Sequence, residues 1–143
     1  MTKIVYNACF GGFSISDAAI KRYAEIKGIK LYPETGKFDH VTYWTVPEDR
    51  RPGELEGEAW RNATQEQRIA HNKSYGDHTI GSREFERNDP VLVQVVEELG
   101  DAANGMCAKL RIAELAPGTP YRIDEYDGSE TVATLDSYEW KTA

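Results

Sequence analysis

The sequence predicts an α+β fold, in which an antiparallel β-sheet carries two main helices packed on one face. Two segments place apolar residues at helical spacing behind a capping residue, and several others alternate polar and apolar residues as strands do. In the last third of the chain, short turns join the strand segments, which makes neighbouring strands antiparallel. With 143 residues, 40% hydrophobic and 29% charged, the chain has the size of one ordinary soluble domain. We therefore expect a single domain over residues 1–143.

The amino-terminal segment combines a strand, a loop with two glycines and a capped helix. Alternation over residues 2–8 predicts the strand, and Ser14 or Ser16 is expected to cap the helix that Gly28 ends. A glycine pair before a helix lets backbone N–H groups and the positive end of the helix dipole face a bound anion. The loop is a candidate ligand cradle, and the alternative is a tight turn with both phenylalanines in the core. Its residues are Phe10, Gly11, Gly12 and Phe13.

The middle of the chain contains one expected strand and a long polar segment. Residues 41–46 predict a strand, which Pro47 ends. Residues 47–77 have few apolar residues, so we interpret them as a long excursion, a possible lid or interface arm, rather than a domain. Within the excursion, Thr64 opens a capping box that predicts a short helix over residues 65–73.

The last third of the chain predicts the second main helix and the remaining strands. Asp89 caps a helix that begins at Pro90, has a broad apolar face and closes at Gly100 or Gly105. A strand over residues 108–115 follows it.

Two turns divide the strands that follow this helix. A Pro-Gly turn at residues 117–118 makes residues 119–125 the expected hairpin partner of the strand over residues 108–115. An Asp-Gly turn at residues 127–128 precedes a further strand over residues 130–135. The result is an antiparallel sheet built mostly from the carboxy-terminal part of the chain.

Charge and composition exclude several classes of function. The net charge of −7 argues against long nucleic acids and anionic membranes as main partners, because such binding needs clustered Lys and Arg. A small anionic ligand stays possible, since a few local arginines suffice for one or two phosphates. The chain has no run of eighteen apolar residues and no signal-peptide pattern, so we expect it in the cytoplasm.

The residues with catalytic potential do not form a recognisable set. The histidines are His40, His71 and His78, none of which flanks a nucleophile motif, and no metal-ligand spacing is present. Cys9 beside the glycine pair could act as a thiolate near a helix start, although a buried thiol is the commoner role. Cys107 is the other expected reduced thiol. We therefore expect a binding protein, not an enzyme, with no cofactor and no metal.

Basic and aromatic residues on or beside the predicted strands and helix start of the carboxy-terminal half favour a binding site for a phosphorylated ligand. Arginine holds phosphate through charge-assisted hydrogen bonds, aromatic rings stack on bases, and an Asn amide pairs with an adenine edge. The alternative is that the arginines are surface charges paired with glutamates such as Glu130. The candidate residues, beyond the glycine loop, are Arg87, Asn88, Lys109, Arg111, Tyr121 and Arg122, with Arg83, Phe85, Tyr126 and Asn7 near them in sequence.

Three blocks of sequence resemble a known group of phage proteins. They are KIVYNACFGGFSIS at residues 3–16, RNDPVLVQVVEELG at residues 87–100, and AKLRIAEL with PYRIDEYDGSETV within residues 108–132. These blocks are similar to small phage and prophage proteins, and to the phage anti-Thoeris proteins that act as sponges for signalling nucleotides. The resemblance covers about the first 28 and the last 55 residues and leaves out the middle excursion.

The resemblance implies an antagonist of bacterial immunity in the cytoplasm of the host. Such a protein is a homo-oligomer assembled from dimers, with interface pockets that sequester cyclic ADP-ribose isomers, and in some members cyclic oligonucleotides, without cleaving them. By resemblance, the glycine loop would form one pocket wall, while Arg87, Asn88, Arg111 and Arg122 would hold pyrophosphate and base. Two alternatives stay open: a nucleotide-degrading enzyme, and an oligomeric protein-interaction module that binds through Trp44, Trp60 and Trp140.

Overall fold

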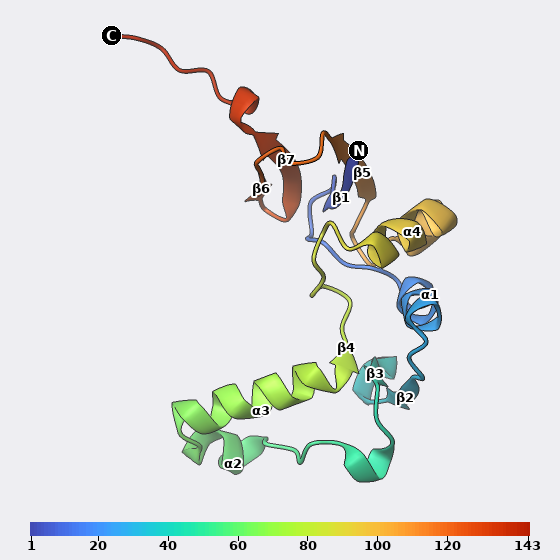
Figure 1. The fold of residues 1–143 in the computed structure, drawn as a ribbon. Helices are drawn as coiled ribbons and strands as arrows, with labels where there is room; N and C mark the ends of the chain where they lie inside the picture. Colours follow the sequence, from blue (N-terminus) through green and yellow to red (C-terminus); the bar gives the residue numbers. More distant parts are fainter. The chain divides into compact units, whose positions relative to one another are not determined.

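The computed structural model describes residues 1–143, which divide into two compact units (Figure 1). The first unit contains Met1–Lys27 and Ser82–Ala143, and the second contains Gly28–Gly81. Both units combine helices with antiparallel strands, so the predicted α+β class is confirmed. The expectation of one domain over residues 1–143 stays a prediction. No helix has both the length and the apolar character that crossing a bilayer requires.

The first unit contains two antiparallel strand pairs. Strand β1 (Thr2–Asn7) pairs with β5 (Leu110–Leu115), with Thr2 opposite Leu115 and Asn7 opposite Leu110. Strand β6 (Tyr121–Tyr126) pairs with β7 (Ser129–Thr134). The two-residue turn between them is formed by Asp127 and Gly128, both at positive φ, as the Asp-Gly signal predicts. A short 3₁₀ turn, Leu135–Ser137, follows β7.

The predicted hairpin between residues 108–115 and 119–125 is wrong. The partner of β5 is β1, from the other end of the chain, and β6 pairs only with β7. Ile4 and Val5 are fully buried, so pairing with β1 covers apolar surface that a local hairpin would leave in water. Pro120 directly before β6 has no N–H to donate to a ladder, which also disfavours continuation from β5.

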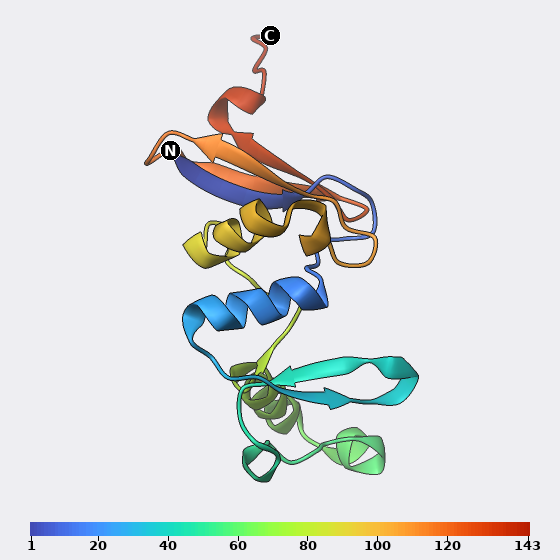
Figure 2. The ribbon, with the colours of Figure 1, turned by 90° about the vertical axis from the view of Figure 1, so that its right-hand side faces the viewer.

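Two helices lie on one side of the strands, in succession rather than side by side. Helix α4 (Pro90–Leu99) contacts β1 and β5, and α1 (Asp17–Lys27) contacts α4 (Figure 2). Leu92 and Val95 are fully buried, because their helical spacing places them on the face toward the strands. A 3₁₀ turn, Gly100–Ala103, follows α4.

The predicted caps of α1 and the predicted start of α4 are confirmed. The Ser16 hydroxyl accepts a hydrogen bond from the Ala19 amide at 3.2 Å, and Gly28 ends α1 with a φ of +70°. The Asp89 carboxylate accepts from the Val91 amide at 2.8 Å, with proline at the first helical position.

The second unit holds a three-stranded antiparallel sheet in the order β2, β3, β4 and two helices. The strands are β2 (Tyr32–Thr35), β3 (Val41–Trp44) and β4 (Thr79–Ile80), and two 3₁₀ turns are Lys37–Asp39 and Glu48–Arg50. The helices are α2 (Gly57–Asn62) and α3 (Gln65–Asp77). Thr64 forms the predicted capping box, and α3 continues four residues beyond its predicted end. The predicted excursion, residues 47–77, therefore contains two helices.

Candidate functional site

Asn7, at the end of β1, ties three loops together. Its side chain is fully buried, and its Nδ2 donates to the carbonyls of Cys9 at 2.6 Å and Gly128 at 2.8 Å. Its Oδ1 accepts from the Lys109 amide at 2.8 Å. A buried amide that makes all these bonds fixes the backbone around it. We call the surface formed by residues 8–13, 106–109 and 126–128 the three-loop site.

Glycines allow the backbones of these loops to approach closely. Gly11 has a φ of +110°, and a Cβ there would lie 2.6 Å from Cβ of Cys107. A Cβ on Gly128 would lie 2.2 Å from the amide nitrogen of Gly12. The Gly11 amide also donates to the Asp127 carbonyl at 3.3 Å. Glycine is thus required at positions 11 and 128 because side chains would push the loops apart.

Each of the three loops exposes one large apolar side chain. Phe10 is 60% exposed, and Met106 and Tyr126 are exposed still further. Lys109 is exposed as well and forms no ion pair. Single exposed apolar residues are ordinary, but here each of three loops bound to one buried side chain carries one.

Several backbone donors of the glycine loop have no partner within the protein. Between Phe10 and Phe13, only the Gly11 amide has a protein acceptor. The amides of Phe10, Gly12 and Phe13 donate to none. The free amides of Gly12 and Phe13 are successive and lie at or directly after glycines with positive φ, an arrangement that binds anions in protein loops.

Beneath the loop, Phe13 and Arg87 belong to the core of the site. Phe13 is buried, and the Arg87 guanidinium lies 3.6 Å from the centre of its ring. Two nitrogens of Arg87 bind the two carboxylate oxygens of Glu130 at 2.6 and 2.8 Å. Glu130 is only 9% exposed, and its carboxylate also accepts a hydrogen bond from the backbone N–H of Asn7 at 2.8 Å. The charge of Arg87 is therefore neutralised within the protein, as the alternative interpretation of the arginines expects.

The other predicted arginines also have partners inside the chain. Arg111, on β5, donates to the Leu110 carbonyl at 2.7 Å and lies 3.9 Å from the Asp101 carboxylate. Arg122, on β6, binds Asp124 at 2.8 Å and lies over the ring of Tyr138, whose hydroxyl accepts from it.

Tyr121 and Arg122 line a different hollow, of about 330 Å³, at the end of β6 away from the Asp-Gly turn. The structure thus brings together the loops that carry Phe10, Gly11, Gly12 and Lys109, while Phe13 and Arg87 are mostly buried. The hollow at the far end of β6 is also lined by Leu135, Tyr138 and Trp140.

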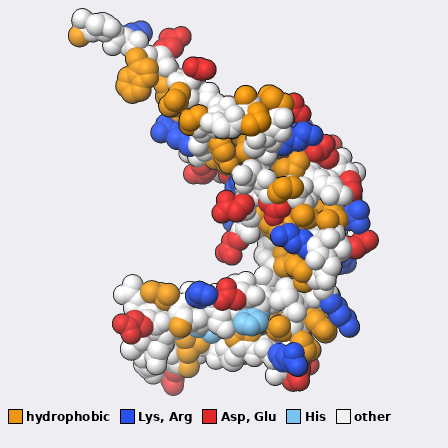
Figure 3. Space-filling model, viewed as in Figure 1, with side chains coloured by type: hydrophobic (Ala, Val, Ile, Leu, Met, Phe, Trp, Pro, Cys, Tyr) orange, Lys and Arg blue, Asp and Glu red, His pale blue; other side chains and the backbone are white.

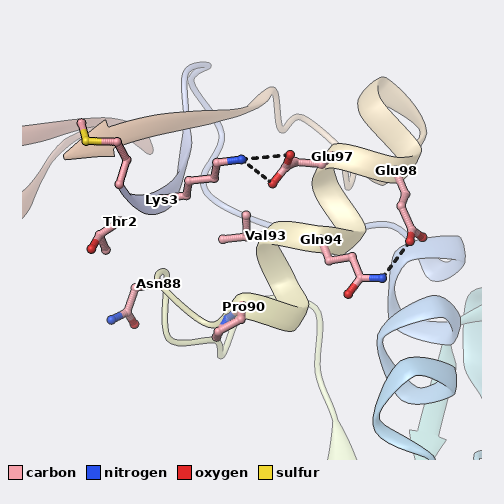
Figure 4. Close-up of a pocket in the computed structure, with 9 residues that line it drawn as sticks. Thr2, Lys3, Asn88, Pro90, Val93, Gln94, Glu97 and Glu98 are labelled. Carbon is pink, nitrogen blue, oxygen red and sulfur yellow. Dashed lines mark hydrogen bonds and ion pairs between the residues drawn. The ribbon is translucent and has the colours of Figure 1, made fainter. Parts of the chain in front are cut away.

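Asn88 lies in a third place, an open groove of about 580 Å³ between β1 and α4 (Figure 4). Lys3, the lysine of this groove, binds both carboxylate oxygens of Glu97 at 3.1 Å. Glu98 accepts from Arg22 at 2.8 Å and from Gln94 at 2.9 Å. The hydrogen bond from Arg22, followed by that from Gln94, lowers the pKa of Glu98 to about 2. Because Lys3 is paired with Glu97, the groove offers an anion no free lysine.

The side chains that could ligate a metal ion form no cluster. No group of three or more His, Cys, Asp or Glu side chains lies close enough to hold a metal ion. His78 Nδ1 lies 2.6 Å from the Ser74 carbonyl, and His71 lies beside the Trp60 and Tyr75 rings. Cys9 and Cys107 are free thiols. On the face drawn in Figure 3, Lys and Arg side chains are scattered among Asp and Glu and form no continuous basic surface.

Two features of the three-loop site differ from or are missing in the sequence-based expectation: the role of Asn7 beside the site and the segment with Met106 and Cys107. Asn7 was a candidate for contact with an adenine edge, but its donors and acceptor are used within the fold. The segment with Met106 and Cys107, where Cys107 has a φ of +64°, carries no turn signal.

No family model matches the chain, and neither a search of curated proteins nor one of solved structures finds a similar protein.

Proposed function

We propose that this protein binds a cyclic nucleotide signal at the three-loop site and holds it without cleaving it. The ligand class is a cyclic ADP-ribose isomer, with cyclic oligonucleotides as a second group, and sequestration would antagonise bacterial immunity during phage infection. The observation that carries the proposal is the set of unpartnered amides at Phe10, Gly12 and Phe13, on a loop that Asn7 links to the segment carrying the unpaired Lys109.

The chemistry of the site matches the parts of such a ligand. Phosphate oxygens can accept from the free amides and from Lys109, and charge assistance strengthens these bonds. The rings of Phe10 and Tyr126 offer flat faces for a base, and the Asp127 carboxylate can accept from an exocyclic amine. Binding of this kind needs no general acid or base, so the proposed role is not that of an enzyme.

The three-loop site is open, and a second copy of the chain would close it. Small-molecule sites bury most of the ligand, which a surface of loops cannot do alone. The exposed side chains of Phe10, Met106 and Tyr126 supply apolar area for contact between copies. The proposal therefore includes a homo-oligomer, as the resemblance implies.

A protein-interaction module is the second candidate function. Trp140 is almost fully exposed, and Leu135 beside it in the same hollow is exposed too. Large exposed aromatic and aliphatic side chains are typical of protein-binding surfaces. Copurification of a protein partner, with loss of that partner in Trp140→Ala, would favour this candidate over the nucleotide site.

Calorimetric titration of the full chain with cyclic ADP-ribose isomers tests the proposal. Phe10→Ala should weaken binding by roughly tenfold, because stacking of one base contributes about 1–3 kcal/mol. Phe38→Ala is the matched control, since Phe38 is a fully exposed phenylalanine in the second unit. Lys109→Ala should weaken binding similarly, with Lys21→Ala as its control. Equal affinity in all four variants would reject the three-loop site.

A further inference from the structure

A separate pocket of about 470 Å³ lies entirely within the second unit. Trp44 at the end of β3 forms part of its wall, and Glu34 on β2 lies near it. Arg51 follows the second 3₁₀ turn, and His71 and Tyr75 project from α3. Three stretches that are distant in the sequence therefore form one hollow, and none of its residues belongs to the three-loop site.

Two buried hydrogen-bond donors of this pocket have no acceptor. Trp44 is only 5% exposed, and its indole Nε1 has no hydrogen-bond partner. The Nε of Arg51 is buried without a partner as well. Each such donor costs about 1–3 kcal/mol in a folded protein, so unpaired donors are rare unless something else satisfies them. An acceptor oxygen supplied by a ligand would remove this cost.

Arg51 holds a position from which it can move. Its guanidinium lies 5.2 Å from the Trp44 ring centre, and its Nη1 binds the Glu34 carboxylate. Glu34 is itself half-exposed, and no second carboxylate binds Arg51. Access of an incoming oxygen to either buried donor therefore requires this one side chain to shift.

The charged side chains that line the pocket indicate what kind of ligand would supply the acceptor oxygen. Glu34 is paired with Arg51, but Glu48, Glu54 and Glu56 line the same pocket without an ion pair. Three uncompensated carboxylates repel phosphates and attract cations. The ligand must therefore combine acceptor oxygens with positive charge.

We propose that this pocket binds a basic peptide segment. The backbone carbonyls of the peptide accept hydrogen bonds from Trp44 Nε1 and Arg51 Nε, and its Lys or Arg side chains reach the three free glutamates. A polyamine would satisfy only the carboxylates, and a nucleotide only the donors. An extended peptide satisfies both, which is why the two sets of groups together point to it.

The indole N–H resonance of Trp44 in the ¹⁵N-labelled full chain reports this binding directly, and Trp44→Phe identifies it. Titration with acetyl-Lys-Arg-Lys-Arg-amide should move this resonance in a saturable way and leave that of Trp140 in place. The acidic peptide acetyl-Glu-Asp-Glu-Asp-amide should move neither. The absence of a Trp44 shift with the basic peptide, or an equal shift with the acidic one, overturns the proposal.

A matched pair of triple variants tests the role of charge. Changing Glu48, Glu54 and Glu56 to Gln should weaken the basic peptide at least tenfold. The control changes three exposed glutamates outside the pocket to Gln and should leave affinity within twofold; these are Glu58, Glu66 and Glu139. Equal weakening by both sets would show attraction to net charge alone and reject the site. Spermine binding as tightly as the peptide would likewise reject it, because spermine has no acceptor carbonyl.

Discussion

Among single residues, Arg87 and Glu130 make the most consequential contact of the first unit. Both side chains are mostly buried, and their two hydrogen bonds support the strand end that carries Asn7. Arg87→Ala should lower the free energy of unfolding by about 3–5 kcal/mol, because it leaves the Glu130 carboxylate buried without its partner. Urea unfolding followed by circular dichroism measures this loss.

The exposed pair of Lys3 and Glu97 provides the control. Its atoms are 3.1 Å apart, but both side chains are more than a third exposed. Lys3→Ala should cost less than about 1 kcal/mol, because water screens exposed ion pairs. Similar losses in Lys3→Ala and Arg87→Ala would mean that the Arg87 pair is not a buried support of the site.

Gly128 tests how closely the loops must approach. Gly128→Ala combines strain at a φ of +85° with a Cβ placed 2.2 Å from the Gly12 nitrogen. Gly118→Ala carries nearly the same strain, at a φ of +83°, but its Cβ would meet no atom within 4 Å. We expect Gly128→Ala to be the more destabilising by about 1–3 kcal/mol in thermal or urea unfolding, the usual cost of overpacking. Equal losses would contradict the close contact between the two loops.

At the scale of elements, the start of α4 should make stability depend on pH. Burial alone would raise the pKa of Asp89, but hydrogen bonds from the Tyr23 hydroxyl and the Val91 and Leu92 amides outweigh it and lower that pKa. Burial, then the Asp89 bond, raises the pKa of Tyr23. A lowered carboxyl pKa contributes stability above the ordinary value of 3.8, and this is lost as pH falls through the lowered pKa.

Asp89→Asn should therefore be less stable than the natural chain at pH 7, and the difference should shrink as the pH falls below 3.8. Asn can still cap the helix but carries no charge to titrate. Urea unfolding at a series of pH values from 7 to about 2 measures this difference. A difference in the free energy of unfolding between the two proteins that stays constant at every pH of the series would contradict the role of the Asp89 charge.

The elements that the sequence predicts well are those set by neighbouring residues. Ser16, Asp89 and Thr64 cap their helices through bonds to amides two or three positions away, and Asp127 with Gly128 needs only its own φ angles to form a turn. The pairing of β5 with β1 could not be predicted, because burial of Ile4 and Val5 decides it across most of the chain. Strand β2 contains a proline and β4 only two residues, so neither has a pattern to detect.

The same division holds for the candidate site. The glycine loop is visible in the sequence, because glycine pairs before a capped helix are a local signal. Pairing of the arginines with glutamates such as Glu130 is an alternative that the sequence offers, but contact between distant segments decides that Arg87 is the arginine that pairs with Glu130. Arg122 and Asp124 are two residues apart on one strand and share a face, which makes that pair predictable in principle.

For the whole molecule, we propose ligands at two local sites of an acidic chain, the three-loop site and the pocket of the second unit. The net charge of −7 disfavours a polyanion as ligand, and the face drawn in Figure 3 shows no continuous basic area. In our proposal, a small phosphorylated ligand is held by backbone amides, one lysine and aromatic rings, and a second copy completes the enclosure. For the acidic pocket of the second unit, we propose a positively charged ligand instead.

Recovery of an intact ligand from the protein is the decisive test of sequestration without cleavage. The full chain is incubated with a cyclic ADP-ribose isomer, separated from free ligand by gel filtration and heated to release what it holds. Mass spectrometry should then recover the isomer with its mass and ring intact, in an amount that falls in Phe10→Ala and not in Phe38→Ala. A product of changed mass, or no ligand retained by the natural chain, would contradict the account.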